Sequence, residues 1–481
     1  MLPALPFDTT HVLIGGSWRA TSATLPLINP SDGTELCHIA RGSAEDINDA
    51  VTAAQAARNG EWGRMTAVDR GRILTRLGQL VLEHVDLLTT LEALDVGKPL
   101  TQARADAVAL ARYCEFYGGA ADKLHGQTIP YLDGYTVYTL REPHGVTGHI
   151  VPWNYPMQII GRSVGAALAM GNACVLKPAE DACLTALMFA HLAQKAGLPD
   201  GALNVVPGLG AEAGAALAAH PGIQHLSFTG SVTTGKAVQH AAAENVVPVT
   251  LELGGKSPQI VFEDADLEDA LPFLVNAGLQ NAGQTCSAAS RILIQRSIFD
   301  RLSSMMADAY RGKTVGPVHA DPDIGPLISA KQRARVQAFL DAASDVPRLA
   351  EAPLPGDLPA NGAYVQPTLF GPVTPDHPLA QDEVFGPVQV LIPFDTEDEA
   401  VEIANGTIYG LVASVWTRDG ARQMRLAKRL QSGQVFLNNY GAGGGVELPF
   451  GGIGKSGHGR EKGFEALYGF STLKTVAARH G

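Results

Sequence analysis

Five short apolar segments between residues 146 and 255 decide the fold. They read VTGHIV (146–151), NACVLKP (172–178), GALNVVPG (201–208), IQHLSFTG (223–230) and PVTLELGG (248–255). The stretches between them include ALMFAHLAQKAG (186–197) and AEAGAALAAH (211–220), which we expect to be helical. Short apolar strands that alternate with helices are typical of a parallel, doubly wound α/β sheet.

The flanking regions extend this pattern. Residues 45–60, 64–95 and 103–122 repeat apolar residues at helical spacing. Residues 127–143 alternate around an Asp-Gly pair, which predicts a β-hairpin. After residue 255 a second α/β series follows, with the strands SPQIVFED, RILIQRS, VQVLIPFD, ASVWTRD and QVFLNN and the helix SIFDRLSSMMADAY.

Composition excludes several classes of function. The 481 residues are enough for two to four domains at roughly 100 to 200 residues each. A net charge of −12 argues against binding to nucleic acid or to an anionic membrane. The first residues lack the basic region of a secretory signal, and the uncharged stretch 163–176 is too short to span a bilayer, so a cytoplasmic location is the default. The five cysteines form no CxxC pair and no HExxH is present, so neither disulfides nor a metal site are expected.

A glycine-rich loop, FTGSVTTGK (228–236), follows one of the predicted strands. A helix that begins there would present free N–H groups and a positive dipole to a diphosphate. The loop also comes close to the P-loop pattern, but Ala237 stands where that pattern needs a magnesium-binding hydroxyl. A magnesium-dependent NTPase is therefore disfavoured.

Three residues together suggest covalent chemistry. Cys286 in NAGQTCS sits at a loop or a helix start, and either place can lower the pKa of a thiol. Glu252 ends a predicted strand before two glycines and can act as a general base. Asn154, between aromatic residues and prolines, can offer an amide to an oxyanion. Each alone is equally explained as a buried thiol, a cap or a turn, whereas together they supply a nucleophile, a base and an oxyanion donor.

The chain resembles the aldehyde dehydrogenase superfamily over nearly its whole length. The motifs that carry the resemblance are PWNYP (152–156), LKPAE (176–180), FTGS (228–231), LELGGKSP (251–258), NAGQTC (281–286), EVFGPV (383–388) and PFGGIGKSGHGRE (449–461). The resemblance implies a Rossmann-like NAD-binding domain (1–123 and 145–254) and an α/β catalytic domain (255–454). It also implies a small β oligomerisation element and C-terminal return (124–144 and 455–481), and hence a homodimer or homotetramer.

The resemblance also assigns catalytic roles. Cys286 would attack the aldehyde carbon, and the Asn154 amide with the Cys286 backbone N–H would hold the oxyanion. Glu252 would activate the water that hydrolyses the thioester, which favours a free acid over an acyl-CoA product. Glu461 matches a proton-relay carboxylate, although a salt bridge at a helix start explains it equally well. A CoA-acylating enzyme and a non-catalytic structural protein on the same scaffold stay as alternatives.

Eight residues match cofactor positions of the family: Trp153, Lys177, Glu180, Gly230, Ser231, Gln332, Glu383 and Phe385. Lys177 and Glu180 would hold the adenosine ribose, and the carboxylate would repel a 2′-phosphate, so NAD is favoured over NADP. Ser231 would contact the pyrophosphate, and Glu383 the nicotinamide ribose.

The substrate is an aldehyde whose side chain the sequence leaves open. Arg162 matches an arginine that binds the substrate carboxylate in succinic semialdehyde dehydrogenases. Those enzymes carry a second arginine where this chain has Gln280, so Arg162 could instead form an internal ion pair. Aromatic or other hydrophobic aldehydes are the alternative, with Tyr155 and Tyr440 as walls of the pocket.

Overall fold

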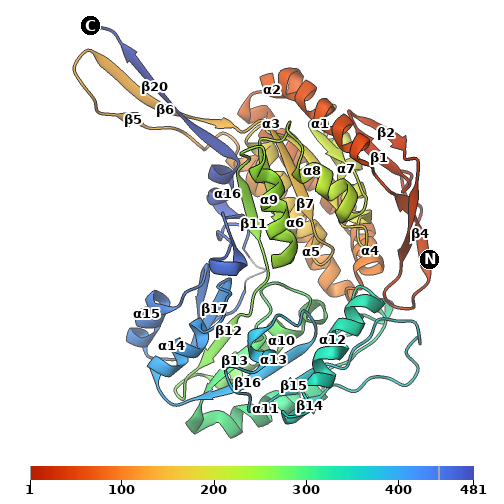
Figure 1. Ribbon diagram of the computed structural model, residues 1–481, viewed down its shortest axis with the longest axis vertical. Helices are drawn as coiled ribbons and strands as arrows, with labels where there is room; N and C mark the ends of the chain where they lie inside the picture. The colour runs from red at the N-terminus through yellow and green to blue at the C-terminus, as the bar shows by residue number, and fades with distance from the viewer. Residues whose placement is uncertain (1, 442–444) are drawn as a thin grey trace.

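An eight-stranded sheet forms the upper half of the molecule in Figure 1. The computed structural model describes residues 2–441 and 445–481. The order of strands across the sheet is β19-β11-β10-β7-β8-β9-β1-β2. Their bounds are β1 His11–Ile14, β2 Ser17–Ala20, β7 Val146–Val151, β8 Ala173–Pro178, β9 Leu203–Val205, β10 His225–Thr229, β11 Val249–Glu252 and β19 Gly457–His458.

The five predicted strands form the parallel centre of this sheet, from β11 to β9. The chain runs from β7 outward through β8 and β9, then returns to place β10 and β11 on the other side of β7. The strand order therefore reverses between β7 and β10. In open α/β sheets, ligands bind beyond the carboxyl ends of the strands at such a switch point.

A second sheet forms the lower half of the molecule (Figure 1). Its order is β14-β15-β16-β13-β12-β17-β18, parallel apart from the β14 edge. The strands are β12 Pro258–Val261, β13 Arg291–Gln295, β14 Arg348–Glu351, β15 Thr368–Phe370, β16 Val388–Phe394, β17 Val412–Trp416 and β18 Gln434–Leu437. The short link 253–257 joins the carboxyl end of β11 to the amino end of β12, so the first sheet's carboxyl ends face the second sheet's amino ends.

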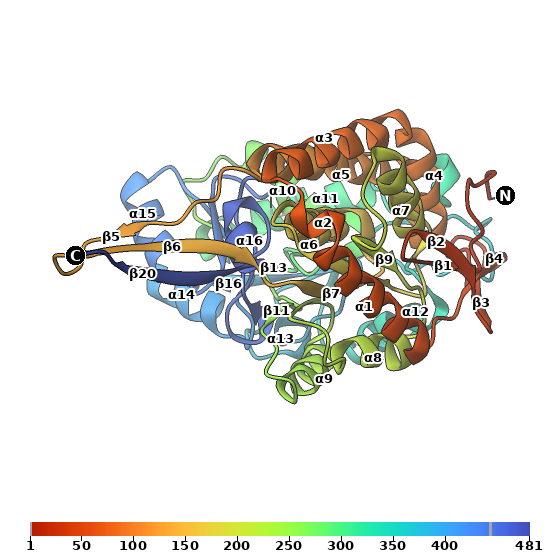
Figure 2. The ribbon, with the colours of Figure 1, turned by 90° about the horizontal axis from the view of Figure 1, so that it is seen from above.

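The predicted hairpin projects from the body as an arm, visible in both Figure 1 and Figure 2. It pairs β5 (Thr128–Ile129) with β6 (Tyr135–Pro143), and β20 (Ser471–Arg479) adds a third strand along the whole of β6. Gly134 takes a φ of +75° at the turn, which glycine adopts without strain. A separate two-stranded sheet, β3 (Thr24–Ile28) with β4 (Glu35–Ala40), lies near the N-terminus.

The helices cover both sheets. Their bounds are α1 Ala44–Asn59, α2 Glu61–Arg64, α3 Ala67–Glu83, α4 Val85–Val96, α5 Leu100–Ala120, α6 Pro156–Ala169, α7 Leu184–Ala196, α8 Ala215–Ala218, α9 Val232–Ala243, α10 Leu267–Leu279, α11 Phe299–Arg311, α12 Ala330–Ala342, α13 Pro378–Gln381, α14 Glu397–Asn405, α15 Gly420–Arg429 and α16 Gly463–Gly469.

The stretch 64–95 is helical as predicted, but it forms two helices, α3 and α4. The chain leaves helical geometry at His84, where φ is −110° and ψ is 19°, and α4 begins at the next residue. Both helices pack on α5 and α7. Their apolar faces continue the same helical spacing across the break, so the sequence period does not reveal it.

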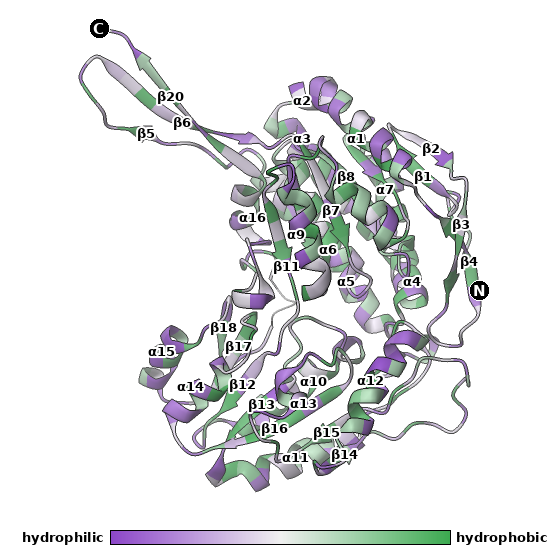
Figure 3. Ribbon diagram, viewed as in Figure 1, coloured by the Kyte–Doolittle hydropathy of each residue, from purple (hydrophilic) through white to green (hydrophobic). Residues whose placement is uncertain are grey.

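Apolar residues concentrate in the strands, whereas the outer faces of α14 and α15 are polar (Figure 3). Each large sheet has its own apolar core, one built around β7 and β8 and the other around β13 and β16. Among the residues that the structure describes, no helix combines the length and apolar character needed to cross a bilayer.

Candidate active site

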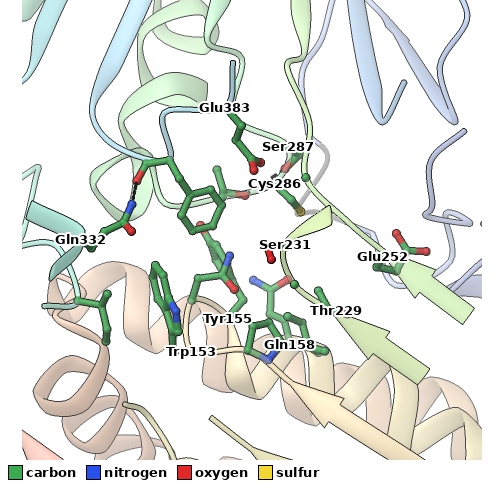
Figure 4. Close-up of a pocket in the computed structure, with 18 of the residues that line it drawn as sticks. Trp153, Tyr155, Gln158, Thr229, Ser231, Glu252, Cys286, Ser287, Gln332 and Glu383 are labelled. Atoms are coloured by element: carbon green, nitrogen blue, oxygen red, sulfur yellow. Dashed lines mark hydrogen bonds between the residues drawn. The ribbon is translucent and has the colours of Figure 1, made fainter. Parts of the chain in front are cut away.

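A cavity of about 370 Å³ lies between the two sheets. The segment after β7 supplies Trp153 and Asn154, the loop after β10 supplies Ser231, and the second sheet's side supplies Cys286 and Glu383. Figure 4 shows the Cys286 sulfur directed into a space that Trp153 and Gln158 bound from the opposite side. The motifs that lie far apart in sequence therefore converge on one cavity at the topological switch point.

Cys286 follows a sharp turn between α10 and β13. Asn281, Ala282 and Gly283 all take positive φ values there, of 50°, 52° and 73°. A loop or helix start can lower the pKa of a thiol, but here burial outweighs that effect and raises the pKa of Cys286 to about 11. Arg162 opposes that rise, while Glu383 adds to it. The thiol therefore needs further positive charge to ionise near neutral pH.

Asn154 is fastened to the loop that carries Cys286. Its side-chain amide donates a hydrogen bond of 3.0 Å to the carbonyl of Gln284, and the Asn281 amide donates one of 3.0 Å to the backbone carbonyl of Asn154. Asn154 is 5% exposed. These bonds join the segment after β7 to the nucleophile loop and fix the Asn154 amide beside it.

Glu252 ends β11 and is 1% exposed. Neither carboxylate oxygen has a hydrogen-bond partner within the described residues. Burial, followed by the charge of Glu461, raises the pKa of Glu252 well above its usual value. Gly451 passes so close that an added Cβ would lie 2.8 Å from Oε1, so a side chain there would clash with the carboxylate. Glu252 is thus a buried, readily protonated carboxyl at the edge of the cavity, to one side of Cys286 (Figure 4).

Arg162, in the middle of α6, forms an internal ion pair with Glu461. This is the alternative that the sequence left open for Arg162. Ser227 donates a hydrogen bond of 2.8 Å to Oε1 of Glu461. Arg162 is 6% exposed and still lines the cavity, where its guanidinium lies 4.9 Å from the ring centre of Phe450. The positive charge of Arg162 is therefore already matched before any substrate enters.

The residues matched to the adenosine end lie at and beyond the carboxyl ends of β8 and β10 in the first sheet. Lys177, on β8, contacts Glu180 at 2.9 Å, and this charge lowers the pKa of Glu180. Neither side chain lines the cavity, although the adjacent Asp181 does. Ser231 caps α9 by accepting a 3.2 Å hydrogen bond from the N–H of Thr234. The predicted strand, loop and helix start at 228–236 are therefore present.

The residues matched to the nicotinamide end form a connected group. The Gly255 N–H donates a 2.9 Å hydrogen bond to Glu383, whose pKa burial raises to about 7. Phe385 has a φ of +58°, and its ring meets Trp153 edge-on at 5.5 Å. Gln332 donates to the carbonyl of Phe385 at 2.8 Å, the bond dashed in Figure 4. All four side chains line the cavity.

Of the two tyrosines predicted to line the substrate pocket, Tyr155 does so and Tyr440 does not. Tyr155 lines the cavity, and its ring lies 3.8 Å from the ammonium of Lys98. Tyr440 does not line the cavity that holds Cys286. It lines a neighbouring cavity of about 830 Å³, and its hydroxyl donates to the carbonyl of Ser287. Tyr155 borders both cavities, and Tyr440 belongs to the small apolar cluster against which Cys286 packs.

The sequence reading missed several residues that line the cavity, among them Gln158, Phe450 and Lys462. Lys462 comes directly after Glu461, the last residue of the motif 449–461. This proximity to the motif was the only signal in the sequence that could have singled out Lys462. Gln158 lies one helical turn before Arg162, and Phe450 lies within the motif 449–461 but was assigned no role. Their types carry no chemical signature that would have selected them.

The model of the aldehyde dehydrogenase family matches residues 18–476. The chain belongs to this family. It is 41% identical over 467 residues to hydroxyisobutyraldehyde dehydrogenase of Mycolicibacterium austroafricanum, covering 96% of this chain and 92% of that protein. As an aldehyde dehydrogenase it also resembles a crystal structure from Burkholderia cenocepacia, with 64% identity, a TM-score of 0.97 and coverage of 98% and 100%. The NAD+ complex of aldehyde dehydrogenase from Bacillus cereus gives 38% identity, a TM-score of 0.95 and coverage of 98% and 97%. The predicted family and fold are confirmed.

Proposed function

We propose that this aldehyde dehydrogenase oxidises an aldehyde to the free carboxylic acid with NAD, through a thioester on Cys286. The observation that carries the proposal is the convergence of Cys286, Asn154 and Glu252 on one cavity that Glu383 and Ser231 also line. A nucleophile, an amide donor and a carboxyl thus share a space with the residues that match cofactor positions. The NAD+ complex of the Bacillus cereus relative supports the choice of cofactor.

In the first step the Cys286 thiolate attacks the aldehyde carbon to give a tetrahedral thiohemiacetal. The Asn154 amide and the Cys286 backbone N–H are the donors for the oxyanion. The Asn154 amide nitrogen carries two hydrogens, so one can keep the 3.0 Å bond to the Gln284 carbonyl while the other is available to the oxyanion. Such a donor stabilises the charge that develops in the transition state.

The cofactor supplies a hydride acceptor when bound. The residues present fit NAD. The Lys177–Glu180 pair suits the two ribose hydroxyls of the adenosine, and the N-terminus of α9 with Ser231 suits the diphosphate. One oxygen of Glu383 accepts from Gly255, which leaves the other for the second ribose. The ionised carboxylate of Glu180 would repel a 2′-phosphate, so we favour NAD over NADP.

In the last step Glu252 takes a proton from the water that attacks the thioester. Burial raises the pKa of this base well above that of an ordinary carboxylate. Because the base acts in its ionised form, hydrolysis falls as pH drops through that raised pKa. Glu461 is held by Arg162 and Ser227. We therefore assign Glu461 the main role of positioning Arg162 and a secondary role in proton relay. The presence of Glu252 favours a free acid over a CoA thioester.

For the substrate we favour an aromatic or other hydrophobic aldehyde over an acidic semialdehyde. Arg162 already has a carboxylate partner, and Gln280 stands where semialdehyde dehydrogenases carry a second arginine. The walls near the thiol include Tyr155, Ile159 and Phe450. Flat apolar walls of this kind accommodate rings and hydrocarbon chains.

We further propose a homodimer or homotetramer held by the arm, with the division into domains described for the family. Exposed apolar residues gather on the arm and its turn: Ile129, Tyr131, Leu132, Tyr138, Leu140 and Leu473. The arm also ends in open strand edges at β5 and β20. Exposed edges and apolar faces of this kind favour pairing with another copy.

An aldehyde panel tests the proposed function. Aliphatic, aromatic and carboxylate-bearing aldehydes would be assayed with NAD and NADP by the absorbance of the reduced cofactor, with the acid product identified by mass spectrometry. We expect turnover with NAD that disappears in C286A. No turnover with any aldehyde, or full activity of C286A, would overturn the proposal.

A further inference from the structure

Gln158 borders the cavity that holds Cys286 but takes part in none of the proposed steps. It lies on α6 and is half-buried. Among the residues that the structure describes, Tyr155, Gln158 and Gln280 are the three that line both this cavity and the neighbouring cavity of about 830 Å³. Gln158 therefore lies at the junction of the two cavities.

The cofactor and the aldehyde reach Cys286 from different sides. Ser231, Glu383 and Phe385, which match cofactor positions, line the cavity that holds Cys286 and not the neighbouring one. With NAD on that side, an aldehyde whose carbon meets the Cys286 sulfur extends toward the junction of the two cavities. Figure 4 shows Gln158 across the cavity from the sulfur. The side chain of the aldehyde therefore meets Gln158.

The amide of Gln158 has a fixed orientation. Its nitrogen donates a 2.5 Å hydrogen bond to Oδ1 of Asp106, while Oδ2 of Asp106 pairs with the ammonium of Lys98. A carboxylate accepts hydrogen bonds and donates none, so the nitrogen of the amide, and not its oxygen, faces Asp106. Within the described part of the chain no group donates to the amide oxygen, and this oxygen is not closed off from solvent. Gln158 thus presents a hydrogen-bond acceptor at the junction.

Buried charges hold this arrangement in place. Lys98 is 0% exposed and donates a second hydrogen bond, of 2.8 Å, to Oε1 of the equally buried Glu92. The same ammonium lies 3.8 Å from the ring centre of Tyr155. Separating a buried ion pair leaves an unpaired charge in the interior, so such pairs resist rearrangement. Lys98 therefore fixes Asp106 and the ring of Tyr155 together.

We propose that Gln158 is a specificity-determining residue, whose amide oxygen accepts a hydrogen bond from a hydroxyl group on the substrate. The substrate is then an aromatic or other largely apolar aldehyde that carries a hydroxyl group. A site with an oriented, half-buried acceptor disfavours an analogue without the donor, because the acceptor loses its partner. The inference rests on the proposed function, because it needs the aldehyde to react at Cys286.

Pairs of aldehydes that differ only in a hydroxyl or a methyl group test the proposal. They are ortho-, meta- and para-hydroxybenzaldehyde with the matching methylbenzaldehydes, and β-hydroxybutyraldehyde with isovaleraldehyde. For each pair, kcat/KM with NAD gives a ratio of hydroxyl over methyl substrate. Comparing this ratio between two proteins cancels the effect of the substituent on the reactivity of the aldehyde.

Q158M keeps the length of the side chain and removes the amide oxygen. We expect the largest hydroxyl-to-methyl ratio of the wild type to fall about tenfold in Q158M, as the loss of one hydrogen bond requires. The kcat/KM for the methyl partner should be retained. A merely structural role of Gln158 would instead lower kcat/KM for both members of the pair and leave the ratio unchanged.

D106N tests the orientation of the amide. An asparagine side chain can donate as well as accept, so the amide of Gln158 can turn and present its nitrogen to the substrate. The ratio should therefore fall in D106N as well. If one of Q158M and D106N fails to fold, the other decides alone.

Q280M is the matched control. Gln280 borders the same two cavities, but no hydrogen bond to a described residue fixes its side-chain amide. The ratio in Q280M should equal that of the wild type. A ratio that falls in Q280M and not in Q158M would overturn the role of Gln158, as would equal ratios in the wild type and Q158M for every pair.

These outcomes are distinct from failure of the proposed function. If the wild type oxidised no aldehyde, or C286A kept its activity, the proposed function itself would fail. If the wild type oxidised both members of a pair, C286A oxidised neither, and Q158M left every ratio unchanged, only the assignment of Gln158 would fall.

Discussion

The Arg162 guanidinium and the Glu461 carboxylate form an ion pair that is almost closed to solvent, on the wall of the cavity that holds Cys286. One partner comes from the first helix after β7 and the other from the segment just before α16. The pair therefore joins the centre of the first sheet to the C-terminal part of the chain. Because Glu461 already neutralises Arg162, this arginine is not available to bind a carboxylate of the substrate.

Replacing Arg162 should destabilise the fold and lower activity on every aldehyde. R162M leaves Glu461 buried without its partner, which typically costs about 3–5 kcal/mol in the free energy of unfolding. The double variant R162M/E461Q should recover much of that loss. Urea unfolding measures the free energy of unfolding of both variants.

The control is R296M, since Arg296 pairs with Asp395 on the open surface, where little change in stability is expected. An R162M protein as stable as the wild type that had lost activity on acidic aldehydes alone would instead establish a substrate clamp.

Removing the Asn154 amide should slow acyl transfer without affecting the thiol. N154A is expected to lower kcat about 100-fold, the usual effect of losing one oxyanion donor. Its KM should change little, because the bond strengthens in the transition state. The rate of Cys286 alkylation serves as the control and should be retained. A kcat equal to that of the wild type would remove Asn154 from the oxyanion site.

Replacing Glu180 should relax the choice of cofactor. In E180S the carboxylate that would repel a 2′-phosphate is gone, while Lys177 stays in place to attract it. We expect the ratio of kcat/KM for NADP to that for NAD to rise at least about fivefold, since a close like-charge contact costs about 1 kcal/mol even in water. Steady-state kinetics with both cofactors measure the ratio. An unchanged ratio would mean that another part of the site selects NAD.

A charge on the arm should dissociate the assembly. Leu473, on β20, is 55% exposed, and L473R would place a cation on the apolar surface proposed for pairing. M424R is the matched control, because Met424 is 61% exposed on α15, away from the arm. Sedimentation velocity should show smaller particles for L473R but not for M424R. Wild-type protein that sediments as a monomer would contradict the role of the arm.

The sequence predicted the secondary structure around the site well, because its strands are short and mostly apolar. Segments such as VTGHIV and NACVLKP are buried on both faces, which leaves no polar alternation to confuse with helix. The break at His84 escaped prediction because the apolar spacing runs through it. The rise in the Cys286 pKa was not foreseen, because a sequence shows the local turn but not the packing that desolvates the thiol.

The sequence alone could not identify which side chains form ion pairs or share a cavity. Arg162 and Glu461 each had two interpretations, and only the three-dimensional juxtaposition selects the ion pair. Tyr440 was grouped with Tyr155 by residue type, but only Tyr155 lines the cavity that holds Cys286. Lys462 stood beside a recognised motif and still went unremarked, because a lone lysine is ordinarily a solvated surface residue.

The central claim is that Cys286 carries the acyl group and Glu252 allows water to release it. The most direct measurement is the mass of E252Q protein after mixing with NAD and an aldehyde that the wild type turns over. The account predicts one burst of reduced cofactor per active site, followed by an acyl adduct on the peptide that contains Cys286. A variant that turns over at the wild-type rate, or an adduct on another residue, would contradict it.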